Sequence, residues 1–311
     1  NGDIGVRLEE RRGYVRKGVE GRLISTTLEA AAKVVARVAG DSTVAYSLAF
    51  ARAAKAALGI GVPQRAIWLR ALMAEMERLA NHLGDIGAIC NDAAFALMLA
   101  HCGMLREEVL RAAKAAFGHR LLMDRIVPGG VTADLDDSRP VKALTAHIRQ
   151  GFPRLVELYD NTTSLQNRTV STGRLSTDLV RRFGAGGPIG RASGRAFDAR
   201  KAPGYPPYDD LDFKMVKRES GDVDGRIWVR IDEVHESLEL IEQIVDRLPS
   251  GPIAYPLAPA LRERRVPQAG GLANEPRDGT SEGLAMMVGF RGDILDWLRT
   301  DETGRVLRGA V

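Results

Sequence analysis

Two carboxylates in the most apolar part of the chain are the side chains whose spacing best suits chemistry. Asp85 and Asp92 lie seven residues apart within residues 83–105. Seven residues make about two turns of a helix, so both carboxylates would share one helix face. Burying an acid is costly unless a base neutralises it. We therefore expect basic partners opposite these residues, either as structural ion pairs or as part of a site.

Metal-ligand and nucleotide-binding patterns are weak in this sequence. The five histidines have no second His or Cys at a ligand spacing, so we interpret each as a structural histidine. Cys90 and Cys102 are expected to be small buried side chains rather than a disulfide or redox pair. Residues 184–190 are glycine-rich, but a helix is predicted before them and Pro188 interrupts them, which argues against a dinucleotide loop.

The candidate carboxylates lie in a part of the chain that is predicted to be mainly helical. Apolar residues at spacings of three and four form the stripe of an amphipathic helix, which begins after Pro63. A later helix is expected to bend at Pro153, because proline removes a backbone donor. The predicted helical segments cover residues 27–58, 69–83, 92–117 and 142–168.

The last third of the chain differs in composition. Residues 183–210 are rich in glycine and proline and predict a long irregular loop, which interleaved arginines and Asp198 should keep packed. Alternation over residues 227–231 predicts a strand, followed by a helix over residues 234–248. Three short strands separated by turns then predict an antiparallel meander, at residues 284–290, 294–299 and 305–311.

Together these elements predict a mainly α fold, a helical bundle with a small antiparallel β appendage. We divide the chain into a helical core, residues 1–183, and a second region, residues 184–311, packed on the same domain. The length of 311 residues suits one substantial core. With 44 Lys and Arg against 40 Asp and Glu, the net charge is +4, which is too small to predict nucleic-acid binding.

No segment predicts a membrane span, because the apolar residues 83–105 include two aspartates and a histidine. No signal peptide is evident, and the scarcity of cysteine indicates a reducing compartment. The chain begins at Asn1 rather than at a methionine, so we expect it to be a fragment of a longer protein.

Several blocks of residues, in one unbroken order, carry a family resemblance. They resemble the large subunit of membrane-bound, energy-converting nickel–iron hydrogenases such as formate hydrogenlyase, whose fold also serves as the 49-kDa subunit of respiratory complex I. The resemblance implies the same mainly helical fold. The matching blocks are residues 65–92, 117–130, 190–194, 198–200, 207–209, 221–226 and 233–241.

The sequence departs from these hydrogenases where the metal is held. The resemblance places a motif with two metal-binding cysteines at residues 37–42, and here its cysteine positions are Ala39 and Ser42. Alanine has no donor atom, and a serine hydroxyl is a poor ligand beside a thiolate for this class of metal. The family's second cysteine pair would fall beyond Val311. The resemblance therefore implies that a nickel–iron centre is not expected and that this chain binds no metal here.

The comparison with complex I implies a quinone site in the vacated cavity. By this resemblance Tyr46 is the counterpart of a tyrosine that donates to the quinone, and Asp92 of an aspartate that holds a histidine. The histidine itself is replaced by Arg16, which cannot act as an acid but can stabilise an oxyanion. Glu20 and Arg37 are expected to line the cavity.

The resemblance implies an oxidoreductase subunit of a membrane-associated, complex I-related assembly. Electrons would come from an iron–sulfur cluster on a small partner subunit and pass to a quinone-like acceptor, or their transfer would be coupled to ion movement in membrane-arm subunits. The chain would be cytoplasmic and peripheral on the inner face of the cell membrane. Two alternatives stay open: a scaffold that does no chemistry, and an active hydrogenase with unusual metal ligation.

Overall fold

The computed structural model of the protein describes residues 18–257 and 279–310. The helices are α1 (Val19–Leu23), α2 (Leu28–Val35), α3 (Thr43–Leu58), α4 (Gln64–Asp92), α5 (Ala96–Phe117), α6 (Arg139–Asn161), α7 (Thr163–Thr169), α8 (Thr177–Phe183), α9 (Gly187–Ala192) and α10 (Val223–Arg247). The strands are β1 (Ile126–Val127), β2 (Gly130–Val131), β3 (Ser281–Val288), β4 (Asp293–Thr300) and β5 (Val306–Ala310). The predicted fold class, mainly helical with small antiparallel sheets, is confirmed.

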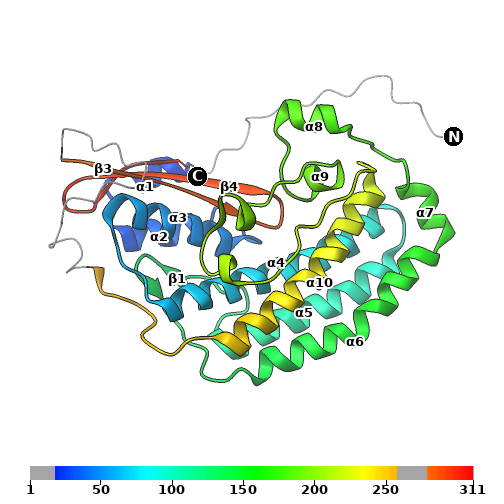
Figure 1. The fold of residues 1–311 in the computed structure, drawn as a ribbon, viewed down its shortest axis with the longest axis horizontal. Helices are drawn as coiled ribbons and strands as arrows, with labels where there is room; N and C mark the ends of the chain where they lie inside the picture. Colours follow the sequence, from blue (N-terminus) through cyan, green and yellow to red (C-terminus); the bar gives the residue numbers. More distant parts are fainter. Residues whose placement is uncertain (1–17, 258–278, 311) are drawn as a thin grey trace.

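Four long helices, α4, α5, α6 and α10, lie side by side as a bundle on one side of the molecule (Figure 1). The apolar stripe predicted for residues 69–83 lies inside α4, and its members Leu69, Leu72 and Met73 are completely buried. Pro63 immediately precedes the first residue of α4, as expected for proline at a helix start. Because α4 contacts both α5 and α10, it forms the centre of the core.

The C-terminal meander is a three-stranded antiparallel sheet with the order β3–β4–β5, as predicted. It lies over α3 on the other side of the molecule (Figure 1). Gly283 sits where β3 approaches α3 most closely, since a side chain there would collide with the backbone of Ala53 and Ala57. The turn between β3 and β4, residues 289–292, extends toward α9, where Gly187 leaves room for the carbonyl of Arg291.

The predicted strand at residues 227–231 is wrong, because these residues form part of α10. Asp222 caps this helix and accepts a hydrogen bond from the amide of Gly225 at 2.8 Å. Ile227, Ile231 and Val234 follow at helical spacings and are all buried. Val229 is buried as well, because other elements pack against α10 on more than one side. Apolar residues therefore occupy positions 227, 229 and 231, a period of two that is typical of a strand.

The other predicted helices are present with different boundaries. Residues 27–58 form α2 and α3, which a turn at residues 36–42 separates. α6 continues through Pro153 and is followed by α7. The glycine-rich residues 183–210 are packed as expected: they include α9 and the short helical turns Arg200–Gly204 and Tyr208–Asp210, and Arg191 and Asp198 are buried.

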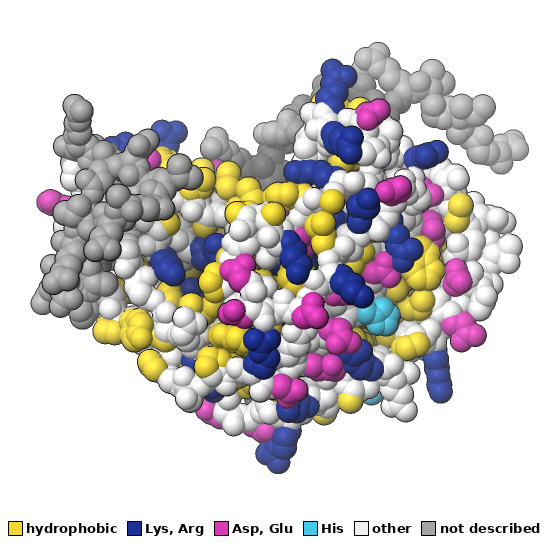
Figure 2. Space-filling view, in the orientation of Figure 1, with side chains coloured by type: hydrophobic (Ala, Val, Ile, Leu, Met, Phe, Trp, Pro, Cys, Tyr) yellow, Lys and Arg dark blue, Asp and Glu magenta, His cyan; other side chains and the backbone are white. Residues whose placement is uncertain are grey.

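Positive and negative side chains are interspersed over the face seen in Figure 2, without a large area of one sign. Across residues 18–257 and 279–310, no helix is both long enough and apolar enough to cross a membrane.

Candidate functional site

The turn between α2 and α3, residues 36–42, holds the two positions that the resemblance assigns to metal ligands. Ala39 is partly buried and ends in a methyl group. Ser42 is buried, and its Oγ lies 3.1 Å from Asp41 Oδ1. The hydroxyl of Thr43 donates to the carbonyl of Ala36 at 2.5 Å, which closes the turn. At these two positions the turn therefore offers only the methyl group of Ala39 and the hydroxyl of Ser42, which is already hydrogen-bonded to Asp41.

Asp41 ties this turn to two other parts of the fold. Its carboxylate forms an ion pair with Arg291 from the β3–β4 turn. Its carbonyl accepts a hydrogen bond from the side-chain amide of Asn81 on α4 at 2.5 Å. The turn is thus held between the central helix and the sheet, which fixes its position relative to both.

Tyr46 lies one helical turn after Ser42, on the same face of α3, and is half-buried. Burial raises the pKa of its phenol, and the charge of Asp41 acts in the same direction, whereas Arg291 lowers it. The pKa of Tyr46 is raised overall, so the hydroxyl keeps its proton at neutral pH and can donate a hydrogen bond.

Glu77 is a carboxyl group that the sequence analysis missed. Its two oxygens accept hydrogen bonds from the amides of Val44 and Ala45 at 2.6 and 3.0 Å, so it caps the start of α3 from α4. Burial raises its pKa to about 8, although both amide bonds oppose the shift. Glu77 therefore exchanges its proton close to neutral pH, next to the 36–42 turn. The sequence carries no local signal for this contact, because Glu77 lies on α4 and the two amides that it binds belong to the start of α3.

A small cavity of about 20 Å³ lies beside the same turn. Gly40, Asp41, Glu77 and Asn81 line one side of it, and Arg106 contributes from α5. A volume of this size holds about one water molecule. A quinone ring does not fit in it as it stands.

Behind the turn lies a network of charged side chains that we call the buried charge network: Glu75, Arg78, His82, Arg191, Asp198, Arg200 and Glu233, all at most 4% exposed. Three arginines face three carboxylates, so the charges balance when His82 is neutral. The sequence carried a signal for it, because Glu75, Arg78 and His82 follow at helical spacings on one face of α4.

Glu75 is the centre of one half of the network. It accepts hydrogen bonds from Arg200 at 2.9 Å, from the hydroxyl of Tyr208 at 2.6 Å and from Ser237 at 2.9 Å. Arg200 also binds Asp198 at 2.7 Å. Arg200 and its neighbours keep the pKa of Glu75 below its ordinary value and that of Asp198 at about 2, despite the opposing effect of burial.

Glu233 is the centre of the other half. It forms an ion pair with Arg191, lies 3.5 Å from Arg78 and lies 2.6 Å from Nε2 of His82. Burial dominates at His82 and lowers its pKa, so the ring is neutral near pH 7. Arg78 donates to the carbonyl of Val288 at 2.6 Å, and the ring of His82 contacts Phe290. The network therefore reaches the β3–β4 turn that carries Arg291.

The predicted site residues do not all meet at the 36–42 turn. Arg16 lies outside the described residues. Glu20 is partly buried in α1. Arg37 does not line the small cavity: it is half exposed and binds Asp124 through both guanidinium nitrogens at 2.8 Å, which directs its side chain to the surface. Tyr46 and the positions of Ala39 and Ser42 do lie together.

Asp85 and Asp92 differ in their surroundings. Asp85 has the basic partner that was expected, Arg230 of α10 at 3.0 Å. Asp92 is exposed and is the last residue of α4, so the expectation that both carboxylates are buried is wrong for Asp92. α4 rises about 22 Å between Glu77, which contacts the start of α3, and Asp92. The structure therefore does not bring Asp92 to Tyr46.

The cysteines and histidines form no metal site among the described residues, where no three His, Cys, Asp or Glu side chains are placed to share an ion. Cys90 and Cys102 are free and completely buried, which confirms the sequence prediction for them. Burial raises both thiol pKa values to about 12, so both thiols stay protonated at neutral pH.

Comparisons with known proteins agree with this fold. The chain is 35% identical over 214 residues to an NADH-quinone oxidoreductase subunit of Desulfotalea psychrophila, covering 68% of the chain and 58% of that protein. It is 33% identical over 244 residues to formate hydrogenlyase subunit 5 of Escherichia coli, covering 77% and 43%. The chain thus spans about half the length of these curated relatives.

A solved structure of the membrane-bound sulfane sulfur reductase, an archaeal respiratory membrane complex, contains a chain with the same fold. The TM-score is 0.83 at 23% identity, over 96% of this chain and 78% of that chain. A family model described as the respiratory-chain NADH dehydrogenase 49 Kd subunit matches residues 91–271, more than half of the sequence. The chain belongs to the family of the 49-kDa subunit of respiratory-chain NADH dehydrogenase, with relatives among hydrogenase subunits.

Proposed function

We propose that this chain is the large subunit of a membrane-associated, complex I-related oxidoreductase and that it works without a nickel–iron centre. The chemistry of the 36–42 turn carries the proposal. Ala39 offers a methyl group, and Ser42 offers a hydroxyl that already contacts Asp41. Nickel and iron of this kind are held by soft thiolates, so the donor set of this turn does not fit them.

In this proposal an iron–sulfur cluster on a small partner subunit supplies the electrons, and membrane-arm subunits hold the assembly at the inner face of the cell membrane. The chain itself holds no cofactor and is peripheral on the cytoplasmic side. Family membership and the fold shared with a chain of a membrane-bound respiratory complex support this placement.

The proposed acceptor is a quinone-like molecule beside the 36–42 turn. The protonated hydroxyl of Tyr46 donates a hydrogen bond to a carbonyl oxygen of the acceptor. Arg291 supplies positive charge that stabilises the oxygen as it becomes negative, and Arg16 is the proposed second stabiliser. Glu77 takes up or delivers a proton near neutral pH. Asp92 is left out of this scheme because of its distance along α4.

Metal content is the first test. The intact complex, isolated with its partner subunits, is expected to contain iron from the partner cluster and no stoichiometric nickel. It is also expected to reduce a quinone and to neither produce nor consume hydrogen. Stoichiometric nickel with hydrogen turnover would contradict the proposal and favour an active hydrogenase with metal ligands elsewhere in the protein.

The substitution Tyr46→Phe tests the acceptor site. If the hydroxyl donates to the acceptor in the transition state, kcat for quinone reduction should fall at least tenfold, about 1.4 kcal/mol. Tyr255→Phe is the matched control, because Tyr255 is 47% exposed and lies after α10, away from the 36–42 turn. Equal rates in the two variants would remove Tyr46 from the mechanism.

A scaffold without catalytic activity is the second candidate, and the small size of the cavity beside Asp41 favours it. Under this alternative both Tyr46→Phe and Glu77→Gln leave quinone turnover unchanged, while substitutions that unfold the chain abolish assembly with the iron–sulfur partner. Measuring turnover and subunit composition on the same preparations separates the two functions.

A further inference from the structure

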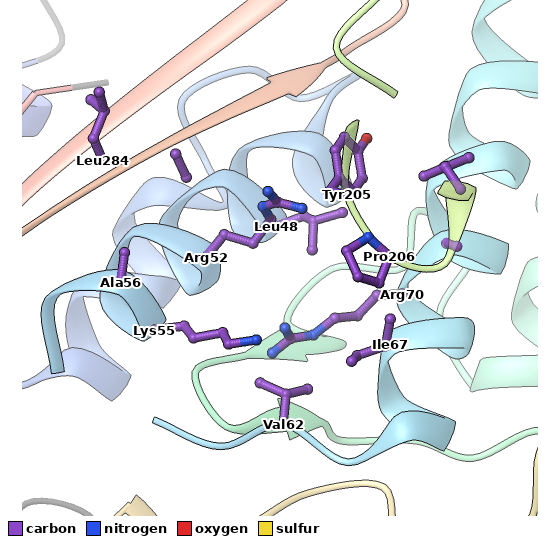
Figure 3. A pocket seen from close by; sticks show the side chains of 13 residues that line it. Leu48, Arg52, Lys55, Ala56, Val62, Ile67, Arg70, Tyr205, Pro206 and Leu284 are labelled. Carbon is purple, nitrogen blue, oxygen red and sulfur yellow. The ribbon is translucent and has the colours of Figure 1, made fainter. Parts of the chain in front are cut away.

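A second and much larger cavity, about 290 Å³, lies farther along α3 than Tyr46 (Figure 3). It is open to solvent on one side and is lined by α3, by the start of α4, by the segment Tyr205–Tyr208 and by β3. Its apolar wall includes Leu48, Val62 and Ile67. Of the residues proposed for the acceptor site, the described ones, Tyr46, Glu77 and Arg291, do not line it.

Three cationic side chains, Arg52, Lys55 and Arg70, line this cavity, and among residues 18–257 and 279–310 no carboxylate lines it. Figure 3 shows the amino group of Lys55 and the guanidinium of Arg70 directed into the same space. Arg52 lies over the ring of Tyr205, 4.1 Å from its centroid, at the upper side of that space.

Arg70 is fixed in place by the backbone. Its Nε and Nη2 donate to the carbonyl of Gly130 at 3.2 and 3.0 Å, and Nη2 also donates to Val127 at 2.6 Å. Its Nη1 has no hydrogen-bond partner among residues 18–257 and 279–310. A buried guanidinium held by carbonyls alone keeps its full positive charge without a counter-ion, so the site is built before any ligand arrives.

The three cations also disfavour one another's charge. Burial, together with the nearby charge of Arg52, lowers the pKa of Arg70 to about 9. The pKa of Lys55 is lowered by burial and by both arginines. Asp209 is near enough to raise the pKa of Arg52, but it is exposed and does not line the cavity. An anion between the three head groups would relieve this repulsion.

In the buried charge network, the arginines lie against carboxylates of this same chain, for example Arg200 against Glu75 at 2.9 Å. At the larger cavity the described chain supplies three cations and no acid to bind them. The missing negative charge is therefore expected to come from a ligand.

We propose that this cavity binds a small molecule that carries a phosphate or carboxylate group on an otherwise apolar body. The oxyanion lies between Lys55, Arg70 and Arg52, and the apolar part lies against Leu48, Val62 and Ile67. This site is separate from the proposed acceptor site and does not depend on the proposed function.

Labelling of Lys55 by an aldehyde tests the proposal. Pyridoxal 5′-phosphate forms an imine with a lysine amine, and borohydride reduces the imine to a stable product that peptide mass spectrometry maps. Pyridoxal is the same aldehyde without phosphate. In the protein purified with its accompanying subunits, Lys55 should be labelled at least about tenfold faster by the phosphate compound, since the phosphate is bound beside the amine.

Lys114 is the matched internal control. It lies in the last turn of α5 and is followed at the fourth position by the capping glycine Gly118, as Lys55 of α3 is followed by Gly59. It is exposed, and it does not line the cavity. Lys114 should therefore react similarly with both compounds, and competitors should not protect it.

Competition and substitution decide the result. Inorganic phosphate or benzoate, at constant ionic strength, should protect Lys55, and the stronger competitor identifies phosphate or carboxylate as the preferred group. Arg52→Gln should abolish the preference for pyridoxal phosphate over pyridoxal, while both reactions become slower because the pKa of Lys55 rises without the nearby charge of Arg52. Equal labelling by both compounds, no labelling by either, or no protection by either anion would overturn the proposal, whatever the activity of the complex.

Discussion

Asp296 is a buried carboxyl group with no charged partner among residues 18–257 and 279–310, and it belongs to neither of the two proposed sites. It lies on β4 opposite Ala285 of β3, on the face of the sheet that packs against α3, and is 1% exposed. Its Oδ2 has no hydrogen-bond partner within the described residues. Burial alone raises its pKa to about 8. At neutral pH the group is therefore mostly protonated.

The raised pKa of Asp296 predicts how Asp296→Asn changes the pH dependence of the free energy of unfolding. The folded protein holds a proton that the unfolded chain, with a pKa near 3.8, releases, so Asp296 lowers the free energy of unfolding as pH rises from about 4 to 8. The loss is roughly 6 kcal/mol at most. In Asp296→Asn this contribution disappears, so denaturant unfolding at pH 5 and pH 8 should give more similar stabilities than in the parent protein.

Thr300→Val is the control for that prediction. Thr300 lies on the same buried face of β4, and its hydroxyl also has no hydrogen-bond partner among the described residues. Removing an unpaired hydroxyl should raise stability by about 1 kcal/mol at both pH values without changing the pH dependence. An unchanged pH dependence in Asp296→Asn would show that the carboxylate is solvated or paired.

At the scale of elements, the contact between β3 and α3 sets how the sheet sits on the helices. Gly283 permits this contact, because a Cβ atom there would collide with the carbonyl of Ala53 and the amide of Ala57. Backbone atoms cannot move aside as the end of a side chain can, so the strand would have to shift as a whole.

Gly283→Ala is therefore expected to destabilise the protein by about 2 kcal/mol or more. Gly103→Ala is the matched control, since Gly103 is exposed within α5 and nothing lies near its missing Cβ atom. That change should stabilise the protein by about 0.5–1 kcal/mol, because alanine loses less backbone entropy in a helix. Thermal unfolding of the two variants checks both the expected loss of stability in Gly283→Ala and the expected gain in Gly103→Ala. Equal changes in stability in the two variants would mean that β3 lies farther from α3.

At the scale of the whole molecule, the buried charge network joins parts that are distant in the sequence. Through Glu75 and Glu233 it links α4 to α10 and to the glycine-rich segment 183–210, and through Arg78 it reaches the sheet. Each charge is compensated only when every element is in place. The network therefore favours one arrangement of the elements around the 36–42 turn.

Glu233→Gln tests this dependence. The substitution leaves Arg191 and Arg78 buried beside a neutral amide, so the free energy of unfolding should fall by about 3–5 kcal/mol. Asp246→Asn breaks the exposed ion pair with Lys142 and should cost less than about 1 kcal/mol. Urea unfolding at pH 7 distinguishes the two. A loss below about 1 kcal/mol for Glu233→Gln would show that water reaches the network.

Local patterns predicted much of this molecule. The stripe of α4 follows from residue periodicity, which reports which side of a helix is apolar. The C-terminal meander follows from short segments separated by turns, and the buried cysteines from the lack of a metal-ligand or redox spacing. Reasoning from periodicity failed at residues 227–231, where a helix buried on several sides shows the alternation of a strand. The motif at residues 37–42 also pointed to the turn that the structure places beside Tyr46.

The fold class, the family and the side-chain types available at the 36–42 turn could be read from the order of residues along the chain. Which charged side chains meet became clear only from the packing of the folded chain. Glu77 caps a helix that begins 34 positions earlier at Thr43, Glu233 neutralises Arg191, and three cations converge on one cavity. Such pairings depend on how whole helices pack, and residue spacing within one helix shows which side chains share a face but not which residues of another element lie against them.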